Sequence, residues 1–230
     1  MRNLVIAVSV ALLSACGGGS SDSQATGNTA ISPTPSIQPN GIYKSDDAVM
    51  IIDPEITNGV LAADSGNNLY SFDAATLKND TLDLKGVHLW FNGGYFYDSS
   101  QTVSLTFNGN TASAMTTINN QSFVHTFIKQ PDSLPLNQLI GTHTNTNDGS
   151  TWDIDSAGTI TINGMCSFSG RLAENDHYFT VAMTATACSP ASYNGNYIGA
   201  AFTVDDNGIT QLVGALYNDT NMIWGTVSVN

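Results

Sequence analysis

The residues best placed to do chemistry form one dense cluster of rings. The segment 88–98, HLWFNGGYFYD, holds five aromatic residues within eight positions around a glycine pair. With those glycines at a hairpin turn, Phe91 would oppose Phe96, and Trp90 would oppose Tyr97 on the other face. One face packs on the core, so the other is either covered by a second part of the molecule or exposed as a platform. Trp and Tyr rings stack on sugars and anchor protein interfaces, so the candidate binding residues are Trp90, Phe91, Tyr95, Phe96 and Tyr97.

Familiar catalytic spacings are absent from the sequence. It contains no Gly-x-Ser-x-Gly, no His-Glu-x-x-His and no phosphate-binding glycine loop. His125 alternates with Phe123 and Phe127, which predicts a hydrogen-bonded core histidine rather than a ligand or base. We therefore expect no catalytic residue and no cofactor. The alternative is a polysaccharide-active enzyme, in which two Asp carboxylates face each other across a groove beside the aromatic hairpin.

Two aspartate-rich segments resemble cation sites only in part. Asp153-Ile-Asp155 has the opening spacing of a calcium loop, but Gly164 stands where the loop needs a bidentate Glu. The segment 205–208, DDNG, is typical of a tight turn. Both segments are interpreted as turns at strand ends, and no metal site is predicted.

Cys166 and Cys188 are predicted to form a disulfide, because two cysteines in an exported chain usually pair. A hairpin with its tip at 173–176 would place Cys166 opposite about Met183, so Cys188 would overshoot. The bridge is therefore expected at the base of the hairpin, where the chain curls back.

The surrounding pattern is that of antiparallel strands. Residues 179–187 alternate between apolar side chains and mostly Thr, and 102–107 alternate in the same way. Asn-Gly and related pairs recur at short intervals, as two-residue hairpin turns require. These signals predict an all-β fold. One or two helical turns are expected over 73–79.

The strands divide into two halves at 134–137, LPLN. We expect an N-terminal β domain over 40–133 and a C-terminal one over 134–230, each with seven or eight short strands. Each half would form a small antiparallel sandwich or barrel, which leaves no long edge exposed. A single interleaved domain is the other possibility. An open apolar cavity inside one half would indicate a lipocalin-like carrier of a small apolar ligand.

The N-terminus predicts export and lipidation. Residues 1–15 have the charged start and apolar run of a signal peptide, too short to span a bilayer. Leu13-Ser-Ala-Cys16 resembles the lipobox of bacterial lipoproteins, in which Cys16 carries acyl chains. Gly17 after the cysteine favours the outer membrane, with the protein facing the periplasm or the cell surface. Cys16 and the Gly-, Ser- and Pro-rich segment up to 39 would form a tether.

The charge of the chain argues against one class of partner. The sequence carries 6 Lys and Arg against 19 Asp and Glu, a formal net charge of -13. Nucleic-acid binding depends on clustered Lys and Arg. We expect a membrane contact through the acyl anchor, a possible protein or glycan partner in the envelope, and no nucleic acid.

Several segments of the last ninety residues resemble a group of uncharacterised proteobacterial outer-membrane lipoproteins. They are 164–170, GMCSFSG; the strand from Tyr178 to Cys188; 197–202, YIGAAF; and the closing 214–217 and 224–225. The resemblance implies a lipobox, a linker and two β-rich halves with a cysteine pair in the second. It implies no activity. We therefore expect a non-catalytic binding or envelope-structural module.

Overall fold

The structure is a computed structural model that describes residues 38–53, 59–91, 94–118 and 121–229. Sixteen β-strands make up nearly all of the regular structure in these ranges, which contain no α-helix. The strands form two groups of eight. The predicted all-β fold with two antiparallel, barrel-like halves is confirmed.

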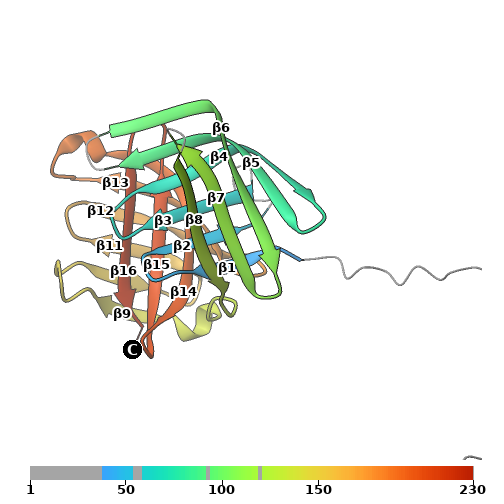
Figure 1. Cartoon of the computed structure of the whole chain (residues 1–230). Helices are drawn as coiled ribbons and strands as arrows, with labels where there is room; N and C mark the ends of the chain where they lie inside the picture. The colour runs from blue at the N-terminus through green and yellow to red at the C-terminus, as the bar shows by residue number, and fades with distance from the viewer. Residues whose placement is uncertain (1–37, 54–58, 92–93, 119–120, 230) are drawn as a thin grey trace, which may run out of the picture. The chain divides into compact units, whose positions relative to one another are not determined.

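The first half is a closed barrel in which each strand pairs with the next and β1 also pairs with β8 (Figure 1). Because β1 bonds to strands on both sides, the sheet has no free edge strand. The strands are β1 (Gly41–Lys44), β2 (Ala48–Ile52), β3 (Val60–Asp64), β4 (Leu69–Lys78), β5 (Thr81–Phe91), β6 (Gly94–Asn108), β7 (Thr111–Ile118) and β8 (Gln121–Lys129).

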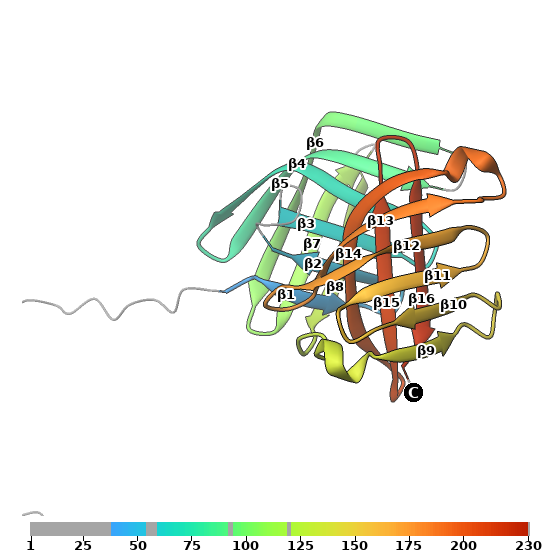
Figure 2. The same cartoon turned by 180° about the vertical axis from the view of Figure 1, so that it is seen from behind.

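The second half is one antiparallel meander from β9 to β16, in chain order. Figure 2 shows β9 to β13 running across β15 and β16, so the sheet folds over on itself through the long strand β14. The strands are β9 (Gly141–Thr144), β10 (Thr151–Ile154), β11 (Thr159–Asn163), β12 (Ser167–Glu174), β13 (Phe179–Thr186), β14 (Gly195–Asp206), β15 (Ile209–Tyr217) and β16 (Met222–Ser228). Two 3-10 turns, η2 (Leu136–Gln138) and η3 (Ala191–Tyr193), lie between strands.

The buried side chains form three clusters, which follow from the period-2 alternation of the strands. One fills the barrel and includes Tyr43 and Leu105. A second fills the folded sheet and includes Trp152 and Leu212. The third joins the halves: the outer face of the barrel, with Ile51 among others, packs on one face of β14 and β15. Strands β14 and β15 are therefore buried on both faces and form a wall that the two halves share.

Three local predictions are settled by these elements. The helical turns expected over 73–79 are wrong, because residues 73–78 belong to β4, and 74–78 pair with β5. His125 is not a core histidine: its side chain is 43% exposed, and its Nε2 contacts Ser45 Oγ at 2.7 Å. The turn predicted at Asp155 is confirmed, since its carboxylate accepts the backbone N–H groups of Ala157 and Thr159.

The predicted signal peptide, Cys16 and nearly all of the tether lie outside the described residues. Within the described ranges, no helix is long and apolar enough to cross a membrane.

Candidate functional site

The aromatic hairpin forms from β5 and β6, but in a different register from the predicted one. Phe91 pairs with Gly94, Trp90 with Tyr95 and His88 with Tyr97. The expected pairs, Phe91 with Phe96 and Trp90 with Tyr97, are wrong. Each register position moves the rings to different neighbours and faces. In the observed register, Trp90 and both tyrosines share one face with His88.

Trp90 is buried at the junction of the two halves. Only 5% of it is exposed, and its ring lies 5.2 Å from that of Tyr217 in β15. For this residue the second half covers the aromatic face, which was one of the two expectations. The other four candidate residues are 41–49% exposed. The hairpin therefore exposes Tyr95 and Tyr97 to solvent on one face, and Phe91 and Phe96 on the other.

Tyr95 and Tyr97 belong to a hydrogen-bonded cluster with His88 and Asp73. Asp73 Oδ1 lies 2.8 Å from His88 Nε2, and Tyr97 Oη donates to Asp73 Oδ2 at 2.7 Å. His88 Nδ1 lies 2.6 Å from Tyr95 Oη. An ionised carboxylate can only accept, so a neutral His88 donates from Nε2 and accepts the Tyr95 hydroxyl at Nδ1. Both hydrogen bonds then donate in the same direction: Tyr95 donates to His88, and His88 donates to Asp73.

A bulge in β5 makes room for the Asp73 carboxylate. The β5–β6 register shifts between Lys85 and Val87, and Gly86 there has φ +70°. A Cβ on Gly86 would lie 1.9 Å from Asp73 Oδ2. Only glycine adopts this conformation readily and leaves the space empty. Bulges often re-aim side chains beside functional sites, and this one allows Asp73 to meet His88 and Tyr97.

Hydrogen bonds, partial burial and nearby charges shift the pKa values of Asp73, Tyr95 and Tyr97. Hydrogen bonds from Tyr97 and then His88 lower the pKa of Asp73. The hydrogen bond to Asp73 raises the pKa of Tyr97. Partial burial raises the pKa of Tyr95, and the negative charges of Asp73 and Asp219 add to this effect. At neutral pH the cluster therefore holds one carboxylate and two protonated phenols.

The opposite face of the hairpin borders a cleft between the halves. The cleft has a volume of about 450 Å³. Phe91 and Gly94 line it from the barrel side, and the β15–β16 turn, η3 and Met165 line it from the second half. Among the described residues, the side chains that line it are all uncharged: Asn67, Phe91, Met165, Ser192, Tyr193, Thr220, Asn221, Met222, Ile223 and Trp224. Phe96, which is 49% exposed, is not among them.

Asn67 and Trp224 connect the two sides of the cleft. Trp224 Nε1 donates to Asn67 Oδ1 at 2.8 Å. Asn67 sits in the β3–β4 turn with φ +61°. Asp64 holds this turn, because its carboxylate accepts N–H groups from Gly66 and Asn68 and the hydroxyl of Tyr70. Burial would raise the pKa of Asp64, but these hydrogen bonds outweigh it and lower the pKa.

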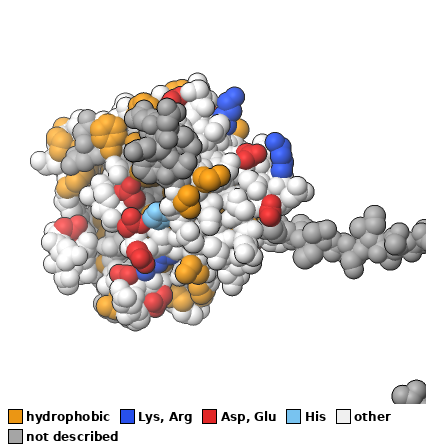
Figure 3. Space-filling model, viewed as in Figure 1, with side chains coloured by type: hydrophobic (Ala, Val, Ile, Leu, Met, Phe, Trp, Pro, Cys, Tyr) orange, Lys and Arg blue, Asp and Glu red, His pale blue; other side chains and the backbone are white. Residues whose placement is uncertain are grey.

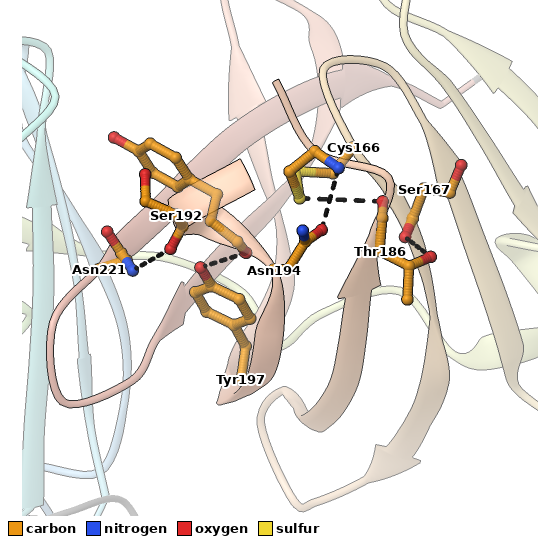
Figure 4. The surroundings of a disulfide bond; sticks show 9 residues. Cys166, Ser167, Thr186, Ser192, Asn194, Tyr197 and Asn221 are labelled. Atoms are coloured by element: carbon orange, nitrogen blue, oxygen red, sulfur yellow. Dashed lines mark hydrogen bonds between the residues drawn. A yellow bond between two sulfur atoms is a disulfide. The ribbon is translucent and has the colours of Figure 1, made fainter. Parts of the chain in front are cut away.

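The predicted Cys166–Cys188 disulfide is present and holds the other wall of the cleft (Figure 4). The expected register is wrong: Met183 pairs with Gly170, and Ser167 with Thr186. The hairpin tip lies at 175–178, further along the chain than expected, so the two cysteines meet at its base. Cys188 N donates to Asn194 Oδ1, and Asn221 Nδ2 donates to Ser192 O. The disulfide therefore fixes one end of the loop that carries η3.

Another face carries an acidic hollow where the barrel meets the β14–β15 turn. Figure 3 shows carboxylates gathered beside a histidine on this face. The hollow, of about 750 Å³, is lined by Asp46, Asp47, His125, Asp205 and Asp206, among others. Lys44 bridges the halves here, with its Nζ 2.8 Å from Asp206 Oδ1. Among the described residues, no group of three or more His, Cys, Asp or Glu is arranged to hold a metal ion.

Several residues of the two hairpin faces were not identified from the sequence. Asp73 and His88 lie fifteen positions apart and meet only through strand pairing. Trp224 also lines the cleft, but no local pattern in the sequence distinguishes it from other strand residues. One signal was available: Gly86, within an alternating strand, is typical of a bulge.

No family model matches the chain, and no curated protein or solved structure is detectably similar to it.

Proposed function

We propose that this protein is a lipid-anchored outer-membrane protein that binds a neutral saccharide, without catalysis, in the cleft between its halves. The observation that carries the proposal is the composition of the cleft. Aromatic rings of Phe91, Tyr193 and Trp224 stand beside the amides of Asn67 and Asn221. Sugar rings stack their C–H faces on aromatic side chains, and their hydroxyls pair with amides and hydroxyl groups. The volume falls within the usual range of small-ligand pockets, about 300–1,000 Å³.

The absence of charge in the lining narrows the ligand class. A bound anion or cation would need a charged partner to offset its desolvation. The lining supplies none, and the formal charge of the chain is -13. A neutral sugar needs only hydrogen bonds and apolar contact, which this cleft offers.

Titration calorimetry with neutral mono- and disaccharides tests the proposal directly. The full chain would carry Cys16→Ser, so that no acyl group is added. We expect Phe91→Ala to weaken binding by roughly tenfold, since a stacked ring contributes about 0.5–1.5 kcal/mol beyond area burial. Phe96→Ala is the matched control, because Phe96 is equally exposed on the same hairpin but does not line the cleft. Equal affinities of the two variants would contradict the proposal, as would the lack of binding to any sugar tested.

The anchor is tested separately. The lipobox resemblance predicts that radiolabelled palmitate is incorporated into the wild-type chain and not into Cys16→Ser, and that the variant leaves the membrane fraction. Protease treatment of intact cells then distinguishes the cell surface from the periplasm. Palmitate labelling that persists in Cys16→Ser would overturn the assignment of the anchor.

A second candidate function is favoured by the Asp73–His88–Tyr95 arrangement. A hydroxyl bonded to a histidine that is oriented by a carboxylate is the usual arrangement for acid–base or nucleophilic catalysis. Here the distances are 2.6 and 2.8 Å, and Tyr95 is 42% exposed. A polysaccharide-active enzyme would then use this relay instead of the expected pair of aspartates.

Release of new reducing ends from neutral polysaccharides distinguishes the two functions. If the protein is an enzyme, Tyr95→Phe should abolish the release and leave saccharide affinity nearly unchanged. Tyr97→Phe is the matched control, because Tyr97 bonds to Asp73 but not to His88. Release that Tyr95→Phe does not reduce would exclude this relay as its source.

A further inference from the structure

The interior of the second half contains a second hollow, separate in character from the cleft. It has a volume of about 140 Å³ and lies on the concave side of the folded sheet. Its walls come from β10 to β16. Its buried lining consists of one polar side chain, Ser150, and eight apolar ones: Trp152, Ile160, Phe168, Leu172, Val181, Met183, Ala201 and Leu216.

A glycine pair makes room for the Trp152 indole, which forms part of the cavity wall. Gly214 in β15 pairs directly with Gly225 in β16. The indole of Trp152 lies over both: added Cβ atoms would be 3.0 and 3.5 Å from its ring. No side chain therefore extends into the interior from either position, and the flat ring of Trp152 covers them.

The lining of this cavity has few hydrogen-bonding groups that could pair with a polar ligand. The buried side-chain polar atoms left unpaired within the described residues are Trp90 Nε1 and His143 Nδ1, and neither residue lines this cavity. Asn145, at the polar end, is already engaged, because its Nδ2 donates to Thr226 O and its Oδ1 accepts from Asn147 N. The exposed Asp148 at the same end disfavours an anionic ligand such as a fatty acid.

We propose that this cavity is a binding site for an uncharged, single-ring aromatic molecule. Apolar cavities of about 150 Å³ stay dry and accept benzene, because water gains too few hydrogen bonds there. A ring of this size would contact the apolar part of the lining, which includes Phe168, Val181 and Leu216. Binding of such a ring does not require a bound saccharide, since the ring needs no hydrogen bond from this lining.

Toluene is a suitable probe, with the full chain carrying Cys16→Ser so that an acyl chain cannot compete. Methyl-resolved NMR should show saturable shifts in Ile160, Leu172, Val181 and Leu216. The methyl groups of Ile52 and Leu105 in the barrel core should not move. The expected dissociation constant is about 0.1–1 mM, as befits a ligand of seven heavy atoms.

A substitution that fills the cavity tests the proposal. Val181→Phe places a ring inside the cavity and should weaken toluene binding at least tenfold. Ala182→Phe places the same ring on the exposed face of the same strand and should leave binding unchanged. If Val181→Phe does not fold, the wild-type methyl shifts decide alone. Shifts confined to the barrel, no saturation up to the solubility limit, or undiminished binding to folded Val181→Phe would each overturn the proposal.

Discussion

Removal of the Cys166–Cys188 bridge should reduce both the stability of the fold and the integrity of the cleft. The bridge spans 22 positions. In the chain-entropy model, closing a loop of this length stabilises the native state by about 3–4 kcal/mol. For a unit of this size, each kcal/mol corresponds to about 2–4 °C in Tm, so the melting temperature should fall by roughly 6–16 °C.

The cleft should respond as well, because the same bridge holds the loop that carries Ser192 and Tyr193. Two treatments remove the bridge: reduction of the wild-type protein, and the double variant Cys166→Ala, Cys188→Ala. Both should lower the free energy of unfolding by the same amount in urea denaturation. Saccharide affinity should fall in both. Both cysteines are buried, so agreement between the two treatments separates loss of the bridge from altered packing.

Two results would contradict this prediction. A loss below about 1 kcal/mol in both treatments would show that the loop is already ordered in the unfolded chain or held by other contacts. An unchanged saccharide affinity, with the expected loss of stability, would show that η3 does not form a wall of the binding site.

Three further predictions follow from local geometry. Gly86→Ala should cost about 1–2 kcal/mol in urea denaturation from its left-handed backbone alone, and should release Tyr97 from Asp73, which NMR titration of the tyrosine hydroxyl would detect. Gly199→Ala should cost about 1–3 kcal/mol, because its Cβ would lie 2.0 Å from the backbone oxygen of Ala215; an unchanged urea midpoint would mean that the strands separate freely. Stability should fall on acidification below about pH 4: the pKa of Asp64 is lowered from its ordinary value of 3.8, so its contribution is complete above that value and is lost as pH falls through the lower folded pKa. Asp64→Asn should be less dependent on pH in this range, and an identical acid profile would count against the hydrogen bonds at that turn.

The fold class could be predicted because it rests on short-range signals. Most of the alternating segment 179–187 became β13, in which Phe179, Val181, Met183 and Ala185 are buried, whereas Ala182 and the threonines are exposed. Turns at Asp155 and at Asn207-Gly208 appear where predicted, with positive φ at the latter pair. Such features depend on neighbouring residues, which the sequence displays directly.

The site was harder to predict because it depends on register. Placing Gly93 and Gly94 at the turn, rather than pairing Phe91 with Gly94, changed the partner of every ring in the hairpin. Asn-Gly favours a two-residue turn, and a turn predicted at 92–93 would have paired Phe91 with Gly94, as observed. The error at the cysteine hairpin has the same origin. Prediction of the contact between Asp73 and His88 further required knowledge that 73–78 is part of a strand, and local helix propensity favoured a helix there.

Met165, Ile223 and Trp224 line both the saccharide cleft and the apolar cavity. Occupancy of one hollow therefore acts on side chains that shape the other. If a sugar alters the affinity for an aromatic ring by some factor, the ring must alter the affinity for the sugar by the same factor. The shared residues would thus link binding at the two proposed sites.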